Sequence, residues 1–404
     1  MKKFAKVLAL CLALVMVIGC FAACGKEKEP NKEDPTVEVQ RDFEFKENFK
    51  IGFICLHDDK STYDLNFLNA AEAAIAELGL TKDQYIIKTN IPEGNECYEA
   101  AKDLVGQGCT VIFANSFGHE NYMIQAAKEF PNVQFCHATG FQASIEKLPN
   151  FHNAFASIYE GRYLAGIAAG MKLNEMIEAG EITADQAKMG YVGAFTYAEV
   201  ISGYSSFYLG AKSVCPSVTM DVQFTGSWYD PILEKEAAEA LIAKDCVLIS
   251  QHADSMGAPG ACEAAGIPNV SYNGSTIEAC PSTFIVSSRI DWTPYYKYII
   301  KCVNTDEAIA TDWCGGIAEG SVALTEVNEA VAAKGTAEAI EKAKAELKAG
   351  TLKVFDVTKF TVDGKALADS DIVYDGYYHE SEKVSAPSFD MNIDGITRLN
   401  ENFG

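Results

Sequence analysis

Aromatic and acidic side chains follow two apolar runs in the middle of the chain, and both residue types are suited to binding a small molecule. The runs cover residues 189–194 and 218–224; the residues that follow them are Phe195, Tyr197 and Glu199 after the first, and Trp228 and Asp230 after the second. Aromatic faces stack on planar rings, with roughly 0.5–1.5 kcal/mol per pair beyond area burial. Carboxylates accept hydrogen bonds from ring N–H, amino or hydroxyl groups. The pattern therefore favours recognition of a flat polar ligand.

The same residue types recur where other apolar runs end, and together they form a candidate ligand-binding set. Its further members are Asp58, Tyr63 and Asp64; Ser116 and Phe117; Asp254, close to His252; and Arg289 and Trp292. Open α/β sheets bind ligands at the carboxyl ends of their strands. If two such sheets face each other, these side chains converge on one space.

Each residue also has a purely structural explanation. Asp59 and Ser61 are good helix N-caps, and Asp230 before Pro231 has the same signature. Phe117 and Phe195 could close the core at the end of a strand. His252 taken alone is better explained as a hydrogen-bonded structural histidine. The hypothesis of a site thus depends on the recurrence of these residue types at one rim.

Catalysis has little support in the sequence. There is no GxSxG, P-loop or HExxH motif, and no GxGxxG follows the first strand. Acid pairs such as Asp58 and Asp59 could do acid–base chemistry, but no nucleophile or metal-ligand set accompanies them. We therefore expect no enzyme, no catalytic residue, no metal and no cofactor.

Strand-like runs alternate with helical patterns in two series, and this alternation predicts the elements that position the site. The first series covers residues 49–136, and one of its helices ends at Gly79. The second has strands near 188–195, 218–225, 246–251, 269–273 and 283–288. Such alternation is typical of a doubly wound, mostly parallel sheet. Two series of similar length predict an α/β protein of two lobes.

The start of the chain indicates an export signal. Lys2, Lys3 and Lys6 precede an uncharged apolar run, 7–23, which is too short and one-sided for a transmembrane helix. The tetrapeptides ending on Cys20 and Cys24 both resemble the bacterial lipobox, and Cys24 is favoured because a polar segment follows it. Ordinary signal-peptidase cleavage is the alternative to lipidation. We predict an extracytoplasmic protein anchored to the cell membrane by a lipid on Cys24, or otherwise on Cys20.

These features predict the domain boundaries. The signal peptide covers residues 1–23, and a disordered tether rich in Lys, Glu and Pro covers 24–47. The first lobe takes 48–157 plus roughly 287–350, and the second takes 158–286 plus roughly 351–404.

The charge and the cysteines limit the partners. The 404-residue chain has a formal net charge of −23, which disfavours nucleic acid. The ten cysteines beyond Cys24 show no CxxC or Cys/His ligand spacing. Free thiols packed as small hydrophobes are favoured over zinc or a disulfide framework.

Several motifs resemble the basic membrane protein (BMP) family of substrate-binding lipoproteins, in particular its branch associated with purine bases and nucleosides. The motifs are GAF…EV from Gly193, SWYDP from Ser227, QHADS from Gln251, the block Arg289–Tyr296, and Gly161–Gly166 of the family's interlobe helix. The resemblance covers residues 50 to about 355. It implies a type I periplasmic-binding-protein fold, a ligand enclosed between the lobes, and the permease subunits of an ABC importer as partners.

The resemblance also implies roles for individual residues. Phe195 would stack on the base with Glu199 near it, while Trp228 and Asp254 would line one wall and Phe117 the other. The branch often has a Gly-Trp…His segment after the first strand, and this chain differs there. Tyr63 would then replace the tryptophan, with Asp64 or Asn66 as its polar partner, which leaves base versus nucleoside open.

We thus expect a monomeric binding protein for a purine base or nucleoside. Three alternatives remain: the same scaffold binding another solute such as a sugar, a surface receptor or adhesin lipoprotein without a transport role, and an anchored nucleoside-cleaving enzyme.

The lipid anchor gives a first prediction. Intact-mass measurement and lipid labelling of the mature protein should show a lipidated Cys24 as its first residue. Lipid on Cys20 would select the alternative site. An unlipidated chain that starts beyond Cys24 would contradict the anchor.

Overall fold

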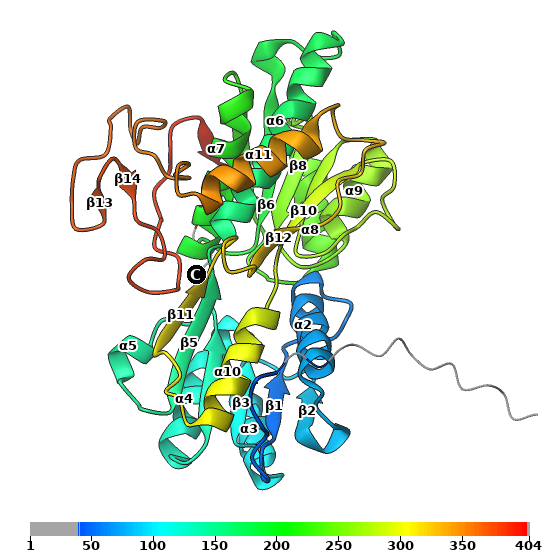
Figure 1. Ribbon diagram of the computed structural model, residues 1–404. Coiled ribbons are helices and arrows are strands. Elements are labelled where there is room, and N and C mark those ends of the chain that lie inside the picture. The colour runs from blue at the N-terminus through cyan, green and yellow to red at the C-terminus, as the bar shows by residue number, and fades with distance from the viewer. Residues whose placement is uncertain (1–38, 40, 402–404) are drawn as a thin grey trace, which may run out of the picture. The chain divides into compact units, whose positions relative to one another are not determined.

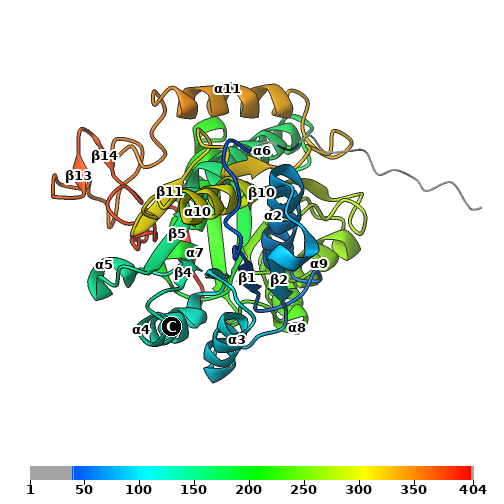
Figure 2. The same ribbon diagram turned by 60° about the horizontal axis from the view of Figure 1, so that its bottom comes forward.

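The computed structural model describes Val39 and residues 41–401, which form two α/β lobes (Figures 1 and 2). Each lobe contains one mainly parallel sheet with helices on its faces. The predicted α/β class and the two-lobed organisation are therefore confirmed. The predicted signal peptide, Cys20, Cys24 and most of the predicted tether lie outside the described residues.

The first lobe contains a six-stranded sheet in the order β11-β5-β4-β3-β1-β2, with every pairing parallel. Its central strands are buried along their whole length, as expected for apolar runs covered on both faces. The strands are β1 (Ile51–Ile54), β2 (Tyr85–Lys88), β3 (Val111–Ala114), β4 (Gln134–Ala138), β5 (Phe151–Ala156) and β11 (Asp312–Gly315). The helices are α2 (Thr62–Leu78), α3 (Asn95–Gly106), α4 (Glu120–Glu129), α5 (Ala143–Glu146) and α10 (Thr293–Thr305).

The second lobe contains a seven-stranded sheet in the order β12-β10-β9-β8-β6-β7-β15, in which only the β12–β10 pairing is antiparallel. The strands are β6 (Lys188–Gly193), β7 (Thr219–Phe224), β8 (Leu248–His252), β9 (Asn269–Tyr272), β10 (Phe284–Ile290), β12 (Val322–Leu324) and β15 (Ile396–Arg398). The helices are α6 (Ile158–Glu178), α7 (Ala198–Val214), α8 (Pro231–Ile242), α9 (Gly257–Ala265) and α11 (Thr336–Lys348). Single 3₁₀ turns cover Lys82–Gln84, Phe117–His119 and Ala184–Gln186, and a short hairpin pairs β13 (Val373–Tyr374) with β14 (Tyr377–Tyr378).

The chain passes between the two sheets at three places: from β5 into α6, from β10 into α10, and from β11 into β12. This corrects the predicted lobe boundaries, which assigned roughly 287–350 to the first lobe. Within that range, α10 and β11 belong to the first lobe, but β10, β12 and α11 do not, since α11 packs on α6. The periodicity identified the strands and helices, but it carries no information on which sheet a strand joins.

The predicted tether is also wrong at its C-terminal end, because residues 41–47 pack on the first lobe. The Phe45 ring stacks on Phe49 with centroids 5.3 Å apart. The carboxylate of Asp42 pairs with Lys301 of α10 at 2.9 Å. The Arg41 guanidinium donates to the Leu78 carbonyl at the end of α2. Because most residues of this segment are charged, the sequence predicted disorder, although the spaced phenylalanines pack on the lobe.

Arg162 of α6 is a buried cation that holds four adjacent strands of the second sheet. Its side chain is fully buried. At 2.8–3.3 Å its terminal nitrogens donate to the Tyr191 hydroxyl (β6), the Ser250 hydroxyl (β8), the Ser271 carbonyl (β9) and the Ser288 hydroxyl (β10). The rings of Tyr191, Phe207 and Tyr272 lie 4.9–5.3 Å from its guanidinium carbon. Since a buried charge is costly unless its donors are paired, this contact fixes α6 against the sheet.

The end of the described chain completes the second sheet. β15 pairs in parallel with β7. Beyond it, the Asn400 side-chain oxygen accepts from the Phe224 N–H at 2.7 Å, and the Asn400 amide donates to the Phe224 carbonyl at 2.8 Å. The C-terminal residues thus hold the end of the strand that leads to Trp228.

The ten described cysteines beyond residue 40 are unpaired, and all but the half-buried Cys314 are buried. Among the described residues, no helix is both long and apolar enough to cross a membrane.

Helices α6 and α7 approach so closely that a glycine is required at the contact. A Cβ atom added to Gly166 would lie 2.0 Å from the Phe207 carbonyl oxygen. In contrast, a Cβ added to Gly260 of α9 would meet nothing within 4 Å.

Gly166→Ala should therefore lower the free energy of unfolding by about 1–3 kcal/mol through overpacking. The control Gly260→Ala should raise it by roughly 0.5–1 kcal/mol, because alanine favours the helix. Denaturant unfolding measures both. Equal stability of Gly166→Ala and the wild type would contradict this packing.

Candidate ligand-binding site

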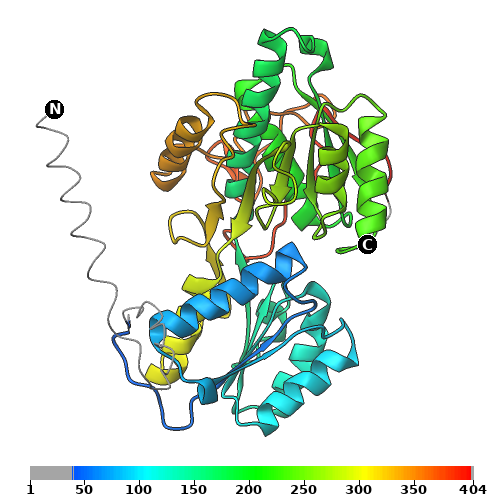
Figure 3. The same ribbon diagram turned by 90° about the vertical axis from the view of Figure 1, so that its right-hand side faces the viewer.

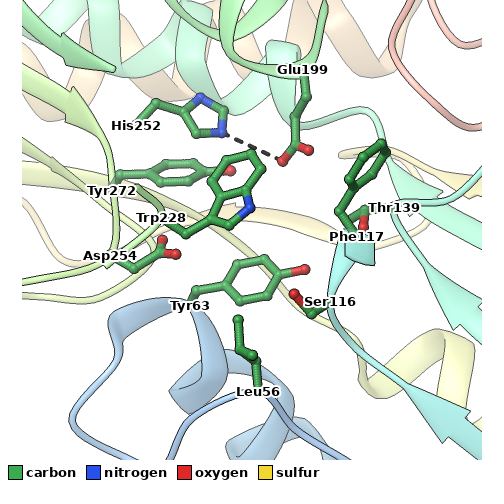
Figure 4. Close-up of a pocket in the computed structure, with 10 residues that line it drawn as sticks. All are labelled: Leu56, Tyr63, Ser116, Phe117, Thr139, Glu199, Trp228, His252, Asp254 and Tyr272. Carbon is green, nitrogen blue, oxygen red and sulfur yellow. Dashed lines mark ion pairs between the residues drawn. The ribbon is translucent and has the colours of Figure 1, made fainter. Parts of the chain in front are cut away.

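A cavity lies between the lobes, where strands of both sheets end (Figure 4). Its lining residues are Leu56, Tyr63, Ser116, Phe117 and Thr139 from the first lobe, and Glu199, Trp228, His252, Asp254 and Tyr272 from the second. The empty space among these side chains, including the part open to solvent, amounts to about 350 Å³.

The cavity is a narrow slot. Only about 20 Å³ of it accepts the centre of a water-sized sphere, little more than the roughly 10–15 Å³ that one water needs. A planar ligand therefore has to spread the walls or enter before the lobes close.

Direct contacts between the lobes show that this conformation is closed. Helix α2, blue in Figure 3, lies on the face of the first lobe that meets the second. At its start, the backbone N–H and the hydroxyl of Thr62 both donate to the Asp254 carbonyl at 3.1 Å. The rings of Phe117 and Tyr197 meet at 5.4 Å, and those of His57 and Tyr229 at 5.3 Å.

A buried polar chain joins α2 to the slot. The Asn66 amide donates to the Asn273 side-chain oxygen at 3.1 Å, and the Asn273 amide donates to the Asp254 carboxyl at 3.4 Å. Asn273 has a φ of 66°, a left-handed conformation that asparagine tolerates better than most residues. Asn66 therefore acts across the lobe boundary, one residue removed from the slot.

Aromatic walls face the slot from both lobes. In the first lobe, the Tyr63 hydroxyl donates to the Asn115 carbonyl at 2.6 Å, which fixes its ring. In the second, the Trp228 carbonyl accepts from the Asp254 N–H at 2.9 Å, and the Trp228 ring packs edge-on against Phe195 at 5.0 Å.

Six of the thirteen predicted ligand-binding residues line the slot: Tyr63, Ser116, Phe117, Glu199, Trp228 and Asp254. The other seven lie outside the lining: Asp58, Asp64, Asn66, Phe195, Asp230, Arg289 and Trp292. Phe195 stacks on Tyr197 at 5.1 Å, and its ring also contacts the ring of Trp228. Asp230 caps α8, accepting from the Ile232 and Leu233 N–H groups at 3.0 Å.

Asp64 is a structural carboxylate beneath the slot. It accepts from the His57 N–H at 3.0 Å and from the Asn115 amide at 2.7 Å. Burial acts to raise its pKa, but the His57 side chain, 3.4 Å away, outweighs burial together with Asn115, the His57 backbone and Ser61, and the pKa lies below its ordinary value. Asp58 lies nearer the surface, where it accepts from the Lys60 N–H at 3.2 Å.

Arg289 and Trp292 lie at one of the passages between the lobes. Arg289 pairs with Asp291 at 3.5 Å. Trp292 is 1% exposed and stacks on Phe67 at 4.7 Å in the core of the first lobe. The chain leaves the second sheet at the end of β10, so residues that follow this strand pack elsewhere.

The sequence analysis missed four lining residues: Leu56, Thr139, His252 and Tyr272. His252 and Tyr272 are the last residues of β8 and β9; in the sequence, His252 taken alone is better explained as a structural histidine, and Tyr272 belongs to an apolar strand run. His252 is neutral, because burial lowers its pKa more than Glu199 raises it; its Nε2 lies 3.5 Å from Glu199 Oε1.

Two buried acids stand at the second lobe's side of the slot. Burial, together with Glu234, Asp64 and Glu199, raises the pKa of Asp254 well above its ordinary value. Asp254 can therefore be a neutral carboxylic acid that both donates and accepts. Burial also raises the pKa of Glu234 to about 7, although the Ser255 side chain and the backbones of Asp230 and Ser255 act to lower it.

Two α/β lobes that meet around a small cavity are the arrangement of proteins that close on a ligand by a hinge. Residues 53–351 match the family described as Bmp, ABC transporter substrate-binding protein PnrA-like. The chain therefore belongs to this family of ABC transporter substrate-binding proteins, which take a small-molecule ligand and work outside the cytoplasm with permease partners. The resemblance inferred from the motifs is confirmed.

Relatives with curated names bind different small molecules. The chain is 31% identical over 281 residues to a purine-binding protein of Brucella abortus. The match covers 69% of this chain and 75% of that protein. It is 33% identical over 54% of its length to a putative ABC transporter glucose-binding protein of Haloferax volcanii, of which it spans 51%.

Solved structures support the fold. An ABC transporter solute-binding protein of Aeropyrum pernix matches with a TM-score of 0.62 at 18% identity, covering 76% of this chain and 93% of that one. The predicted type I periplasmic-binding fold is thus confirmed.

Glu234 predicts how stability depends on pH. Its pKa is about 7 when folded and ordinarily 4.5, so between these values the folded protein binds more protons than the unfolded chain. The free energy of unfolding should fall as pH rises through this window, by roughly 3 kcal/mol at about 1.4 kcal/mol per pKa unit.

Glu234→Gln should remove this part of the pH dependence, as measured by denaturant unfolding between pH 4.5 and 8. Glu236→Gln, an exposed position on the same helix, is the control and should retain the wild-type slope. A slope unchanged in Glu234→Gln would rule out the assignment.

Proposed function

We propose that this protein captures a purine base or nucleoside between its lobes and delivers it to an ABC importer, while attached to the cell membrane by a lipid on Cys24. The observation that carries the ligand class is the combination of aromatic walls with acidic groups in one closed slot. Trp228 and Phe117 offer flat faces from opposite lobes, and such faces suit a planar heterocycle.

The polar groups of the slot fit the edge of a purine. Glu199 is an acceptor for ring N–H or amino groups, while a neutral Asp254 can donate and accept together. Sites that present matched donors and acceptors reject ligands lacking the partner groups. The name of the Brucella relative supports the same class.

The slot disfavours phosphorylated ligands. None of its ten lining residues is Lys or Arg, and burial lowers the pKa of His252, the lining histidine. Glu199 and Asp254 would leave a phosphate dianion without a cationic partner. A base or nucleoside is therefore favoured over a nucleotide.

Closure provides the mechanism of capture. Ligand enters between separated lobes, and contacts such as Thr62 with the Asp254 carbonyl form as the lobes meet. A ligand that touches both walls stabilises the closed state by its extra affinity for that state.

A sugar is the second candidate ligand, supported by the glucose-binding name of the Haloferax relative. Aromatic faces also pack against sugar rings, and Glu199 can accept from hydroxyl groups.

Calorimetry and thermal-shift measurements test the proposal. The compounds are adenine, hypoxanthine, adenosine, inosine, D-glucose and AMP. At least one purine base or nucleoside should bind and raise the melting temperature, while AMP should not. Binding of D-glucose without any purine would overturn the purine assignment in favour of the sugar.

Trp228→Ala should weaken binding of the identified ligand at least tenfold, since about 1.4 kcal/mol of lost stacking and burial suffices. Ile232→Ala is the control, because Ile232 lies nearby on α8 but is 70% exposed. Equal affinity of Trp228→Ala and the wild type would exclude the slot as the binding site.

A further inference from the structure

Tyr272 brings a buried hydroxyl to the slot. It is the last residue of β9, is 2% exposed and lines the cavity. Its hydroxyl has no hydrogen-bond partner among the described residues. Figure 4 shows the oxygen directed toward the side of the slot where Glu199 and Trp228 lie. Buried polar groups in folded proteins are nearly always hydrogen-bonded. We therefore expect a ligand atom in the cavity to be the hydrogen-bond partner of this hydroxyl.

The tyrosine ring is held from two sides. The Arg162 guanidinium carbon lies 5.3 Å from the ring centroid, and the His252 ring lies 4.4 Å away at 42°. Arg162 is itself fixed by its hydrogen bonds to β6, β8, β9 and β10. The hydroxyl is therefore presented in one position before any ligand arrives.

The surroundings make this hydroxyl a donor. Burial raises the pKa of Tyr272 well above its ordinary value, so the phenol keeps its proton at physiological pH. The neighbouring groups include a carboxylate acceptor, Glu199, 3.5 Å from His252.

Tyr272 and Glu199 both line the slot from the second lobe, so they offer a donor and an acceptor to a ligand there. Such a pair is complementary to a heterocycle edge with an acceptor next to a donor. The carbonyl and N–H of a cyclic amide have this arrangement, and so do a ring nitrogen and a neighbouring amino group.

We propose that Tyr272 is a specificity-determining residue of the slot, whose hydroxyl donates a hydrogen bond to a ring nitrogen or carbonyl oxygen of the ligand while Glu199 accepts from the adjacent N–H. The proposal deepens the proposed function and rests on it for the identity of the ligand. It assigns a direct contact to a side chain whose hydroxyl has no partner within residues 41–401 or at Val39.

Tyr272→Phe tests the assignment because it removes the hydroxyl and keeps the ring beneath Arg162. Its affinity for hypoxanthine or adenine should fall about tenfold, whereas its melting temperature without ligand should equal or exceed that of the wild type. The latter follows because the lost hydroxyl makes no hydrogen bond within the described protein.

Tyr191→Phe is the matched control. The Tyr191 hydroxyl accepts from Arg162 Nη2 at 3.0 Å, and Tyr191 is absent from the cavity lining. This variant should lose melting temperature but bind the same ligands with an affinity within about twofold of the wild type. The two variants therefore separate a ligand contact from a structural contact.

Wild-type affinity in Tyr272→Phe would overturn the proposal, as would a drop in melting temperature as large as that of Tyr191→Phe. If the wild type binds no purine, the proposed function fails separately, and D-glucose then serves as the probe for the same comparison. A Tyr272→Phe variant that binds D-glucose as tightly as the wild type would again reject the contact.

Discussion

A single buried positive charge organises the second lobe. The Arg162 guanidinium is removed from water without an ion pair among the described residues, so neutral acceptors and aromatic faces must replace its hydration. Those acceptors belong to four adjacent strands, which fixes the strands relative to one another and to α6. The ends of three of them carry slot residues. The cost of leaving a guanidinium unpaired thus restrains the register of the sheet beside the slot.

The boundary between the lobes is held differently. It depends on a few neutral hydrogen bonds, such as Asn66 with Asn273, and on ring contacts such as Phe117 with Tyr197. Neutral hydrogen bonds contribute only about 0.5–1.5 kcal/mol each. The lobes are therefore joined to each other by individually weak contacts, so a ligand that contacts both can shift the balance between the open and closed states.

The sequence predicted the elements well, because alternating apolar runs and helical patterns are local features. It predicted the sheet membership of the region after residue 287 poorly, because β10 joins one sheet and the helix directly after it packs on the other. The same passage explains Trp292, whose position after a strand suggested the slot although it lies in the core of the first lobe.

The site was predictable where the side chain follows a strand, as with Trp228 and Asp254. The role of Tyr272 was not predictable, because in the sequence it is one more residue of an apolar strand. Only the three-dimensional structure shows that its hydroxyl has no partner among the described residues. The raised pKa of Glu234 likewise arises from packing that no local pattern encodes.

The parallel pairing of β15 with β7 has a consequence for how the protein is made. The contact between Asn400 and Phe224 joins residues 176 positions apart. Pairings between distant segments form late, because a long loop must first be closed. A growing chain can assemble the first five strands of the first lobe early, yet β7 lacks its partner at the edge of the second sheet until residues 396–398 have been synthesised. The second lobe's wall of the slot is therefore completed later than the first lobe's wall.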